Sequence, residues 1–190
     1  MVAAKTNLKL RYSLLKHYYS LFISQKGLGS IFNTPFLIFP LDDNNYEDVW
    51  AETQFLLGNN LMATPILDQG ITSREVYFTS VNWYNLYTGE MHKPGKANIT
   101  NIQLTDKLPL FLREGTMILM QNTDNVMNTK DLNSEFHLVI GFSSNNGKSV
   151  GGQRSFEAKG SHISISDYAD ESKVSRCLAE SCLYNFVLAL

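Results

Sequence analysis

The order of hydrophobic and polar positions divides the chain into one helical segment followed by a series of strands. Near the N-terminus, large apolar side chains recur at steps of four and three residues: Leu8, Tyr12, Leu15, Tyr19 and Phe22. This spacing places them on one face of an α-helix. Leu14, Tyr18 and Leu21 widen the apolar stripe, so we expect the helix to be buried against a large partner. No such partner is evident in the next few dozen residues.

Beyond the helix the apolar period falls to two, which is typical of strands. The run at residues 36–39, bracketed by Pro35 and Pro40, predicts a short buried strand, and residues 46–54 predict a helical turn. Further strands are predicted at residues 61–67, 75–79, 83–87, 99–104, 108–112 and 117–120. Many short strands separated by glycine-containing turns predict an antiparallel β-sandwich.

The last third of the chain is more polar. Residues 121–134 predict a linker, and strand patterning resumes at residues 136–142 and 161–166. Between these strands, residues 143–152 are rich in Ser, Asn and Gly and predict a loop.

Composition excludes several classes of protein. The chain has 190 residues, of which 44% are hydrophobic and 18% charged, so it can bury a core and is not disordered. A net charge of −2 and the lack of a Lys/Arg stripe exclude the electrostatic footprint of a nucleic-acid binder. No apolar run approaches the roughly 18 residues of a membrane helix. The first residues also lack a signal-peptide core.

The titratable residues do not form a recognisable catalytic or metal-binding pattern. Three groups of neighbouring carboxylates occur: Asp42 with Asp43, Glu47 with Asp48, and Asp167 with Asp170 and Glu171. Such groups in polar loops are typical of turns and helix caps. The four histidines are scattered without a second ligand at helical spacing: His17, His92, His137 and His162. We therefore expect no metal and no cofactor.

Two cysteines and one sequon bear on the compartment of the chain. Cys177 and Cys182 stand five residues apart, a spacing compatible with a small disulfide loop, with free thiols or, with further ligands, with a metal. Asn98-Ile99-Thr100 is a sequon for N-glycosylation.

Two surface candidates have a structural and a functional interpretation. Arg113 and Glu114 precede Gly115 at a predicted hairpin turn, where a charged pair is typically a solvated tip. Trp83, Tyr84 and Tyr87 are suited to stacking on a sugar, although an aromatic run in a strand is more typical of a core.

Five stretches, in order, resemble the C-terminal portion of glycoside hydrolase family 31, the α-glucosidase family. They are LRYSLLKHYYSLF at residues 10–22, PFLIFP at 35–40, TQFLLGNNLMATPIL at 53–67, VYFTSVNWYNLYTG at 76–89 and LPLFLREGTMIL at 108–119. The resemblance covers residues 8 to 120. The chain departs from the family pattern at Lys16, where the family has proline, and at Asn85, where it has aspartate.

The resemblance implies a mainly β fold, an antiparallel β-sandwich preceded by the last helix of a truncated (β/α)8 barrel. It divides the chain into a barrel remnant at residues 1–32, a proximal β-sandwich at 33–121 and part of a distal β domain at 122–190. The parent would hydrolyse terminal α-glucosidic bonds by a retaining two-carboxylate mechanism without a cofactor. Neither catalytic aspartate motif of the family occurs in the chain, so the resemblance implies no catalytic residue here and a chain that is inactive alone.

Other interpretations stay open. The chain could be a non-catalytic carbohydrate-binding or interaction module that uses exposed aromatic residues such as Trp83 or Tyr87. It could also be a structural subunit that docks onto a separately encoded catalytic barrel. Family resemblance implies a lysosomal, secreted or secretory-pathway location and an α-glucoside or oligosaccharide as the substrate of the intact parent.

Overall fold

The fold is known from a computed structural model, which describes residues 2–24, 30–39, 48–100, 102, 107–132, 136–141, 143–145, 148–150, 154–158, 161–165 and 183–188. These residues form a mainly β structure in which every strand pair is antiparallel, accompanied by a few helices. The predicted fold class is confirmed at this level. The domain boundaries after residues 32 and 121 stay a prediction.

The centre of the fold is a six-stranded sheet with the order β1-β2-β3-β8-β5-β6. Its strands are β1 (Phe32–Asn33), β2 (Phe55–Leu57), β3 (Leu61–Ala63), β8 (Leu110–Arg113), β5 (Trp83–Asn85) and β6 (Met91–His92). The pairing of β3 with β8 joins segments that lie about 50 residues apart, with Met62 opposite Phe111.

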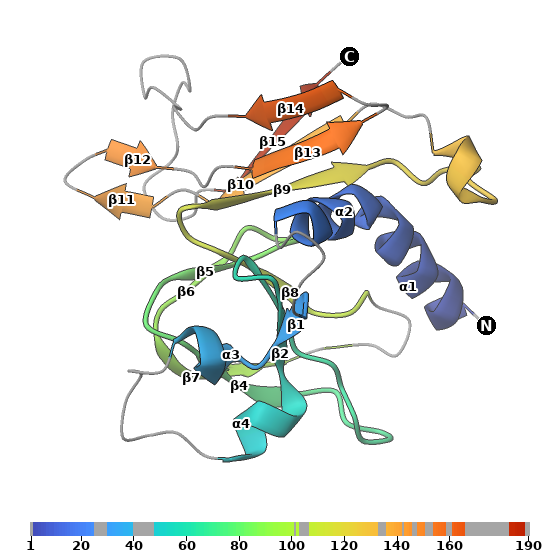
Figure 1. The fold of residues 1–190 in the computed structure, drawn as a ribbon. Helices are drawn as coiled ribbons and strands as arrows, with labels where there is room; N and C mark the ends of the chain where they lie inside the picture. The colour runs from blue at the N-terminus through green and yellow to red at the C-terminus, as the bar shows by residue number, and fades with distance from the viewer. Residues whose placement is uncertain are drawn as a thin grey trace.

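A second sheet has the order β15-β10-β9, formed by β15 (Leu183–Leu188), β10 (Phe136–Gly141) and β9 (Thr116–Gln121). Three two-stranded ribbons complete the strands: β4 (Arg74–Phe78) with β7 (Gly95–Ile99), β11 (Ser143–Asn145) with β12 (Lys148–Val150), and β13 (Arg154–Ala158) with β14 (Ser161–Ile165). Figure 1 shows β9, β10 and β13–β15 in the upper part of the molecule and the six-stranded sheet with β4 and β7 below.

The N-terminal helical segment consists of α1 (Val2–Ser13) and α2 (Leu15–Ser24), which pack on β9 (Figure 1). They are separated at Leu14. There the carbonyl of Leu10 accepts hydrogen bonds from both the Ser13 hydroxyl (2.7 Å) and the Leu14 amide (3.2 Å). A serine that bonds back to the preceding turn typically bends a helix, which accounts for the interruption.

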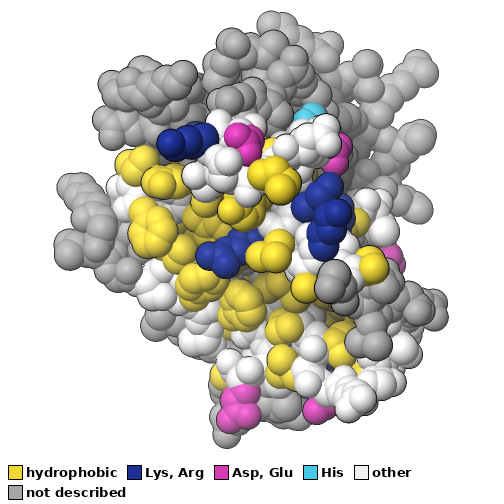
Figure 2. Space-filling view, turned by 90° about the vertical axis from the view of Figure 1, so that its right-hand side faces the viewer, with side chains coloured by type: hydrophobic (Ala, Val, Ile, Leu, Met, Phe, Trp, Pro, Cys, Tyr) yellow, Lys and Arg dark blue, Asp and Glu magenta, His cyan; other side chains and the backbone are white. Residues whose placement is uncertain are grey.

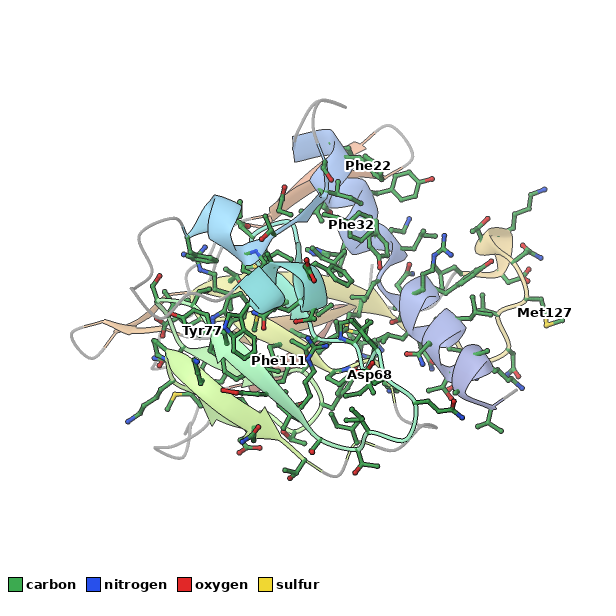
Figure 3. The ribbon with its side chains drawn as sticks, turned by 90° about the horizontal axis from the view of Figure 1, so that it is seen from below. Phe22, Phe32, Asp68, Tyr77, Phe111 and Met127 are labelled. Carbon is green, nitrogen blue, oxygen red and sulfur yellow. The ribbon has the colours of Figure 1, made fainter. Side chains whose placement is uncertain are left out.

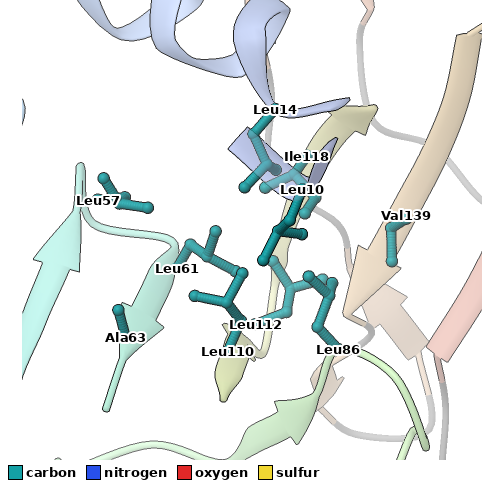
Figure 4. Packing of buried hydrophobic residues seen from close by; sticks show 10 residues of the cluster. All are labelled: Leu10, Leu14, Leu57, Leu61, Ala63, Leu86, Leu110, Leu112, Ile118 and Val139. Atoms are coloured by element: carbon teal, nitrogen blue, oxygen red, sulfur yellow. The ribbon is translucent and has the colours of Figure 1, made fainter. Parts of the chain in front are cut away.

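Both faces of the six-stranded sheet are buried, and successive strand residues point to opposite faces. We call the face toward α1 and β9 the aliphatic layer (Figure 4): Leu10, Leu14, Leu57, Leu61, Ala63, Leu86, Leu110, Leu112, Ile118 and Val139. We call the opposite face, covered by β4 and β7, the aromatic layer: Leu56, Met62, Val76, Phe78, Trp83 and Phe111. The structure is therefore layered around a central sheet rather than built as two sheets alone.

The predicted helical segment is confirmed, and the prediction of its buried face was right only in part, since Leu14 and Leu21 are buried as expected. Leu8, Tyr19 and Phe22 are 54%, 58% and 51% exposed. The buried stripe consists of Leu10, Leu14, His17 and Leu21, which repeat with the same spacing of four, three and four. The periodicity fits both stripes equally, so it does not decide which of them faces the core.

Two predicted segments differ in type. Residues 36–39 were predicted as a strand, but the structure has helix α3 (Pro35–Ile38), with Thr34 as N-cap and Phe39 N donating to Pro35 O at 2.9 Å. Proline at the first helical position is pre-organised for a helix, so this proline starts one instead of bounding a strand. The loop predicted at residues 143–152 contains β11 and β12.

Other predictions are confirmed with shifted bounds. The helical turn at residues 46–54 is α4 (Asp48–Thr53), and a further 3-10 helix, η1 (Thr129–Asp131), lies within the predicted linker. The predicted strand at residues 61–67 ends at Ala63. Of the strand predicted at residues 99–104, Ile99 belongs to β7, and residues 101, 103 and 104 lie outside the described residues.

Candidate functional site

The exposed stripe of the helical segment is the first candidate site. Leu8, Tyr19 and Phe22 on this stripe, together with the half-exposed Phe32 of β1, form what we call the outward face. Figure 3 shows Phe22 and Phe32 on the same side of the molecule, beside α2. Ring contacts continue inward, from Tyr18 to Phe32 (6.5 Å between centroids) and from Phe32 to Phe55 (5.9 Å). These ring contacts connect Phe32 of the outward face to α2 and to β2.

Exposed apolar residues are not confined to this stripe. Among the described residues, the other exposed large hydrophobic side chains are Val2, Leu67, Ile71, Tyr87 and Met127. Figure 2, which views the molecule from the side that carries α1, shows hydrophobic side chains gathered on that face with Lys and Arg among them. Contiguous exposed apolar surface is typical of an interaction site.

A second candidate is an open pocket of about 330 Å³ between α4 and the segment that leads into β4. It is lined by Trp50, Thr53, Ile66, Leu67, Asp68, Ile71, Ser73, Arg74 and Glu75. The Arg74 guanidinium donates to the Pro65 carbonyl. Burial lowers the pKa of Arg74, and the Asp68 carboxylate opposes this shift. The carboxylates of Asp68 and Glu75 are both exposed, so the pocket is an open surface of mixed polarity rather than an enclosed catalytic cleft.

The charged pair at the β8–β9 turn is not the solvated tip that the sequence predicts. Arg113 and Glu114 are both partly buried. The Arg113 guanidinium lies 5.0 Å from the centre of the Phe39 ring, and the Glu114 carboxylate accepts a hydrogen bond from Asn82 Nδ2 at 2.8 Å. Burial lowers the pKa of Arg113, opposed by Glu114. The pair therefore fastens the hairpin to its neighbours.

The aromatic residues proposed as a sugar-stacking platform do not form one. Trp83 is 0% exposed, and its indole Nε1 donates to the Thr79 carbonyl at 3.1 Å. Tyr84 is also buried. The Tyr87 side chain is partly accessible to solvent, but its hydroxyl donates to the Leu108 carbonyl at 2.7 Å. In addition, Lys107 Nζ lies 5.3 Å from the centre of the Tyr87 ring. Trp83 thus belongs to the core, and the Tyr87 ring is held against the residues before β8.

Sequence reasoning missed two buried amides that organise the sheet. The Gln54 side chain donates to Tyr77 O at 2.7 Å and accepts from Tyr77 N at 3.1 Å, which completes the backbone hydrogen bonding of that residue. Asn60 Nδ2 donates to Met117 O at 3.2 Å, while the backbone carbonyl of Asn60 accepts from Arg113 N at 2.7 Å. Their positions within the apolar stretch at residues 53–67 were the only signal in the sequence.

Asn85, which stands where the family has aspartate, acts locally. Its Oδ1 accepts from the backbone amides of Tyr87 (2.9 Å) and Thr88 (3.2 Å). A side-chain oxygen in this position forms an Asx turn, a role that aspartate and asparagine perform equally. The departure therefore leaves the turn intact.

The remaining titratable candidates do not converge. His17 is buried on the inner side of α2, and His92 is stacked on Phe78 with 4.7 Å between ring centres. No group of three His, Cys, Asp or Glu side chains that could hold a metal occurs among the described residues. Cys177, Cys182 and the acidic residues at positions 42, 43, 47, 167, 170 and 171 lie outside the described part. Within that part, no helix has the length and apolar character to span a membrane.

Comparison with known proteins connects these observations to a family. The model of the glycosyl hydrolase family 31 C-terminal domain matches residues 29–118. Lysosomal acid α-glucosidase of Tetrahymena pyriformis is 30% identical over 198 residues, which cover 96% of this chain and 20% of the relative. Intestinal sucrase-isomaltase of Rattus norvegicus is 34% identical over 140 residues, covering 73% of this chain and 7% of the relative.

Solved structures agree on the fold. The glucosidase II α subunit in its Tris-bound form superposes with a TM-score of 0.58 at 20% identity, over 85% of this chain and 19% of that one. The chain spans about a fifth or less of the length of these relatives. The matched region contains the six-stranded sheet, the Gln54 amide and the Arg113 hairpin. The chain therefore belongs to glycoside hydrolase family 31, of which it carries the C-terminal portion.

Proposed function

We propose that the chain is a C-terminal fragment of a family 31 α-glucosidase, in which it supports a catalytic (β/α)8 barrel. Residues 1–32 would supply the last barrel helix, residues 33–121 the proximal β-sandwich and residues 122–190 part of a distal β domain. The parent would cleave terminal α-glucosidic bonds of glucosides or oligosaccharides, and the chain alone would be inactive. A lysosomal or secretory location follows from the same relationship.

The observation that carries this proposal is the helical segment with two apolar stripes. One stripe fills the aliphatic layer through Leu10 and Leu14, whereas Leu8, Tyr19 and Phe22 of the outward face remain about half exposed. Burying a large apolar side chain contributes roughly 1.5–3 kcal/mol. A helix packed between the sandwich and a barrel would bury both stripes, which explains why both carry large apolar side chains.

The chemistry of the parent requires two carboxylates about 5 to 5.5 Å apart, one as nucleophile and one as acid and base. In the chain, the pocket beside α4 has the exposed Asp68 and Glu75 on its wall, next to an arginine that is bound to the Pro65 carbonyl. This arrangement favours a structural role for the chain rather than a catalytic one. The catalytic groups would be supplied by the barrel.

Two measurements test the proposal. The purified chain should not hydrolyse p-nitrophenyl α-glucoside, and turnover by the chain alone would contradict it. The Tetrahymena relative, shortened by the region that this chain matches, should bind the chain and recover hydrolysis. Recovery should be lost in a Leu8→Ser, Tyr19→Ser, Phe22→Ser variant.

A matched control is Met127→Ser, which removes an exposed apolar side chain away from Phe22 and Phe32 (Figure 3). This variant should recover hydrolysis as well as the unaltered chain does. Equal recovery by the triple variant would show that the outward face does not contact the barrel.

A further inference from the structure

The sequon at residues 98–100 is the only Asn-X-Ser/Thr sequence in the 190 residues. Its asparagine lies on β7, in a ribbon whose exposure alternates strictly: Lys96 and Asn98 are exposed, whereas Gly95, Ala97 and Ile99 are partly buried. Ala97 and Ile99 pack against the aromatic layer. The alternation therefore directs the Asn98 side chain away from the core, and Thr100, which follows the strand, is also exposed.

The outer face of the ribbon is covered at one end and open at the other. Next to α4, Tyr77 stacks on Trp50 (6.1 Å between centroids), and Lys96, the cross-strand partner of Tyr77, lies 5.6 Å from the centre of the Trp50 ring. The next outward pair is Glu75 opposite Asn98, and both residues are exposed. A group attached to the exposed Asn98 side chain would therefore point away from the aromatic layer, on the same face of the ribbon as Glu75.

We propose that Asn98 is an N-glycosylation site of this protein. The donor is an oligosaccharide linked to a lipid pyrophosphate. Asn98 Nδ2 forms a bond with the anomeric carbon of the sugar and gives up one proton. The bond between that carbon and the pyrophosphate oxygen breaks, and the lipid pyrophosphate leaves with the bonding electrons. Thr100 supplies the hydroxyl that the sequon requires.

The glycan would also protect a strand edge. Among the described strands, β7 pairs with β4 alone, so its other side is an edge of this two-stranded ribbon. Such edges are templates for pairing with other chains, and proteins block them with bulky or charged groups. A glycan on Asn98, near the end of β7, hinders the approach of a second strand. This inference does not depend on catalytic activity, because an inactive chain can be glycosylated.

The test is secretion of the full chain, behind a cleavable signal sequence, from a eukaryotic host that glycosylates. Trypsin should release residues 97–107, the peptide ANITNIQLTDK, with a glycan on Asn98. Peptide N-glycosidase should remove the glycan and convert that asparagine to aspartate. Asn98→Gln and Thr100→Ala should abolish the modification, whereas Thr100→Ser should retain it.

Two further arms keep the outcome decisive. Asn101→Gln replaces an asparagine outside the sequon and should leave the glycan in place. If a variant is not secreted, translation in the presence of microsomes reports the modification by gel mobility independently of folding. An unmodified peptide 97–107 from translocated chain would overturn the proposal. A modified peptide from a chain that fails to support a barrel would leave it standing while contradicting the proposed function.

Discussion

The two faces of the six-stranded sheet are built from different kinds of side chain. Adjacent residues of β8 illustrate this, because Leu112 belongs to the aliphatic layer and Phe111 to the aromatic layer. The aliphatic layer collects residues from Leu10 to Val139 and so holds the helical segment and β9–β10 to the sheet. The buried members of the aromatic layer all lie between residues 56 and 111.

This difference indicates separate roles for the two layers. Rings make contacts that depend on angle, as in the edge-to-face pair of Phe78 and Phe111 at 5.0 Å and 79°. Aliphatic contacts depend mainly on volume and tolerate exchange of similar residues. We therefore expect the aromatic layer to fix the geometry of the matched domain, and the aliphatic layer to decide whether the N-terminal helices stay attached.

The largest expected effect comes from paired substitutions on β8. Phe111→Ala should destabilise the chain by about 3–5 kcal/mol, and Leu112→Ala by about 2–5 kcal/mol, because both side chains are fully buried. Urea denaturation gives the free energies. Hydrogen exchange should then separate the variants, with faster exchange in β4 and β7 for Phe111→Ala and in α1 and α2 for Leu112→Ala. Identical exchange patterns would show that the layers are not independent.

A smaller effect is expected at Gln54, which joins α4 to the aromatic layer. Gln54→Ala leaves both backbone groups of Tyr77 without their partner. Each unsatisfied buried group costs about 1–3 kcal/mol, so two groups near the lower end of that range give an expected loss of about 2–3 kcal/mol in the free energy of unfolding. The control is Gln69→Ala at an exposed position, which should stay within about 0.5 kcal/mol. Equal losses at both positions would contradict the role of the buried amide.

The sequence predicted the positions of the strands better than it predicted which face of each element is buried. The alternation of apolar and polar residues predicted β4, β5, β8, β9 and β10, because this period depends on the strand itself and not on its partners. It could not show that Trp83 is buried, because both faces of the central sheet are covered and exposure depends on ribbons distant in sequence. In the same way, the sequence could not show that Leu10 is buried and Leu8 exposed, because the two helical stripes to which they belong have equal periodicity.

The candidate site was predictable only in part. The family resemblance predicted that catalytic groups would be lacking from this portion, and this stays a prediction. The partners of Arg113 and Glu114 were not predictable, because Phe39 and Asn82 approach them through the sheet rather than along the chain. Asn98 was evident as a sequon, but its exposure follows from the register of β7 on β4.

Gly58 tests how closely the helices approach the sheet. Its φ of +64° is left-handed, and a Cβ built there would lie 2.5 Å from Leu21 Cδ2. Gly70 has a φ of +80°, but no atom lies within 4 Å of its Cβ position. Gly70→Ala should therefore cost only the backbone strain, about 1 kcal/mol, and Gly58→Ala about 2 kcal/mol. Thermal denaturation measures both, and equal losses would mean that Leu21 moves away freely.

The smallest expected effect is a pH dependence that arises in the aromatic layer. His92 stacks on Phe78 at 4.7 Å and meets Phe111 edge-on at 5.3 Å. Burial lowers the pKa of His92, opposed by the Glu90 carboxylate. The unfolded chain, with a histidine pKa of about 6.5, then binds a proton more readily than the folded chain does. The contribution of neutral His92 to stability is therefore complete above about pH 6.5 and is lost as the pH falls toward the lowered pKa.

His92→Phe keeps a ring between Phe78 and Phe111 but removes the titration. The free energy of unfolding of this variant should fall less between about pH 7 and pH 5 than that of the unaltered chain, as measured by urea denaturation at each pH. Because His92 is only about half buried, solvent screens the imidazole and the difference in slope should be modest. Superimposable pH profiles would show that the histidine is protonated equally in the folded and unfolded chains, and the aromatic layer would then have no part in the acid sensitivity of the fold.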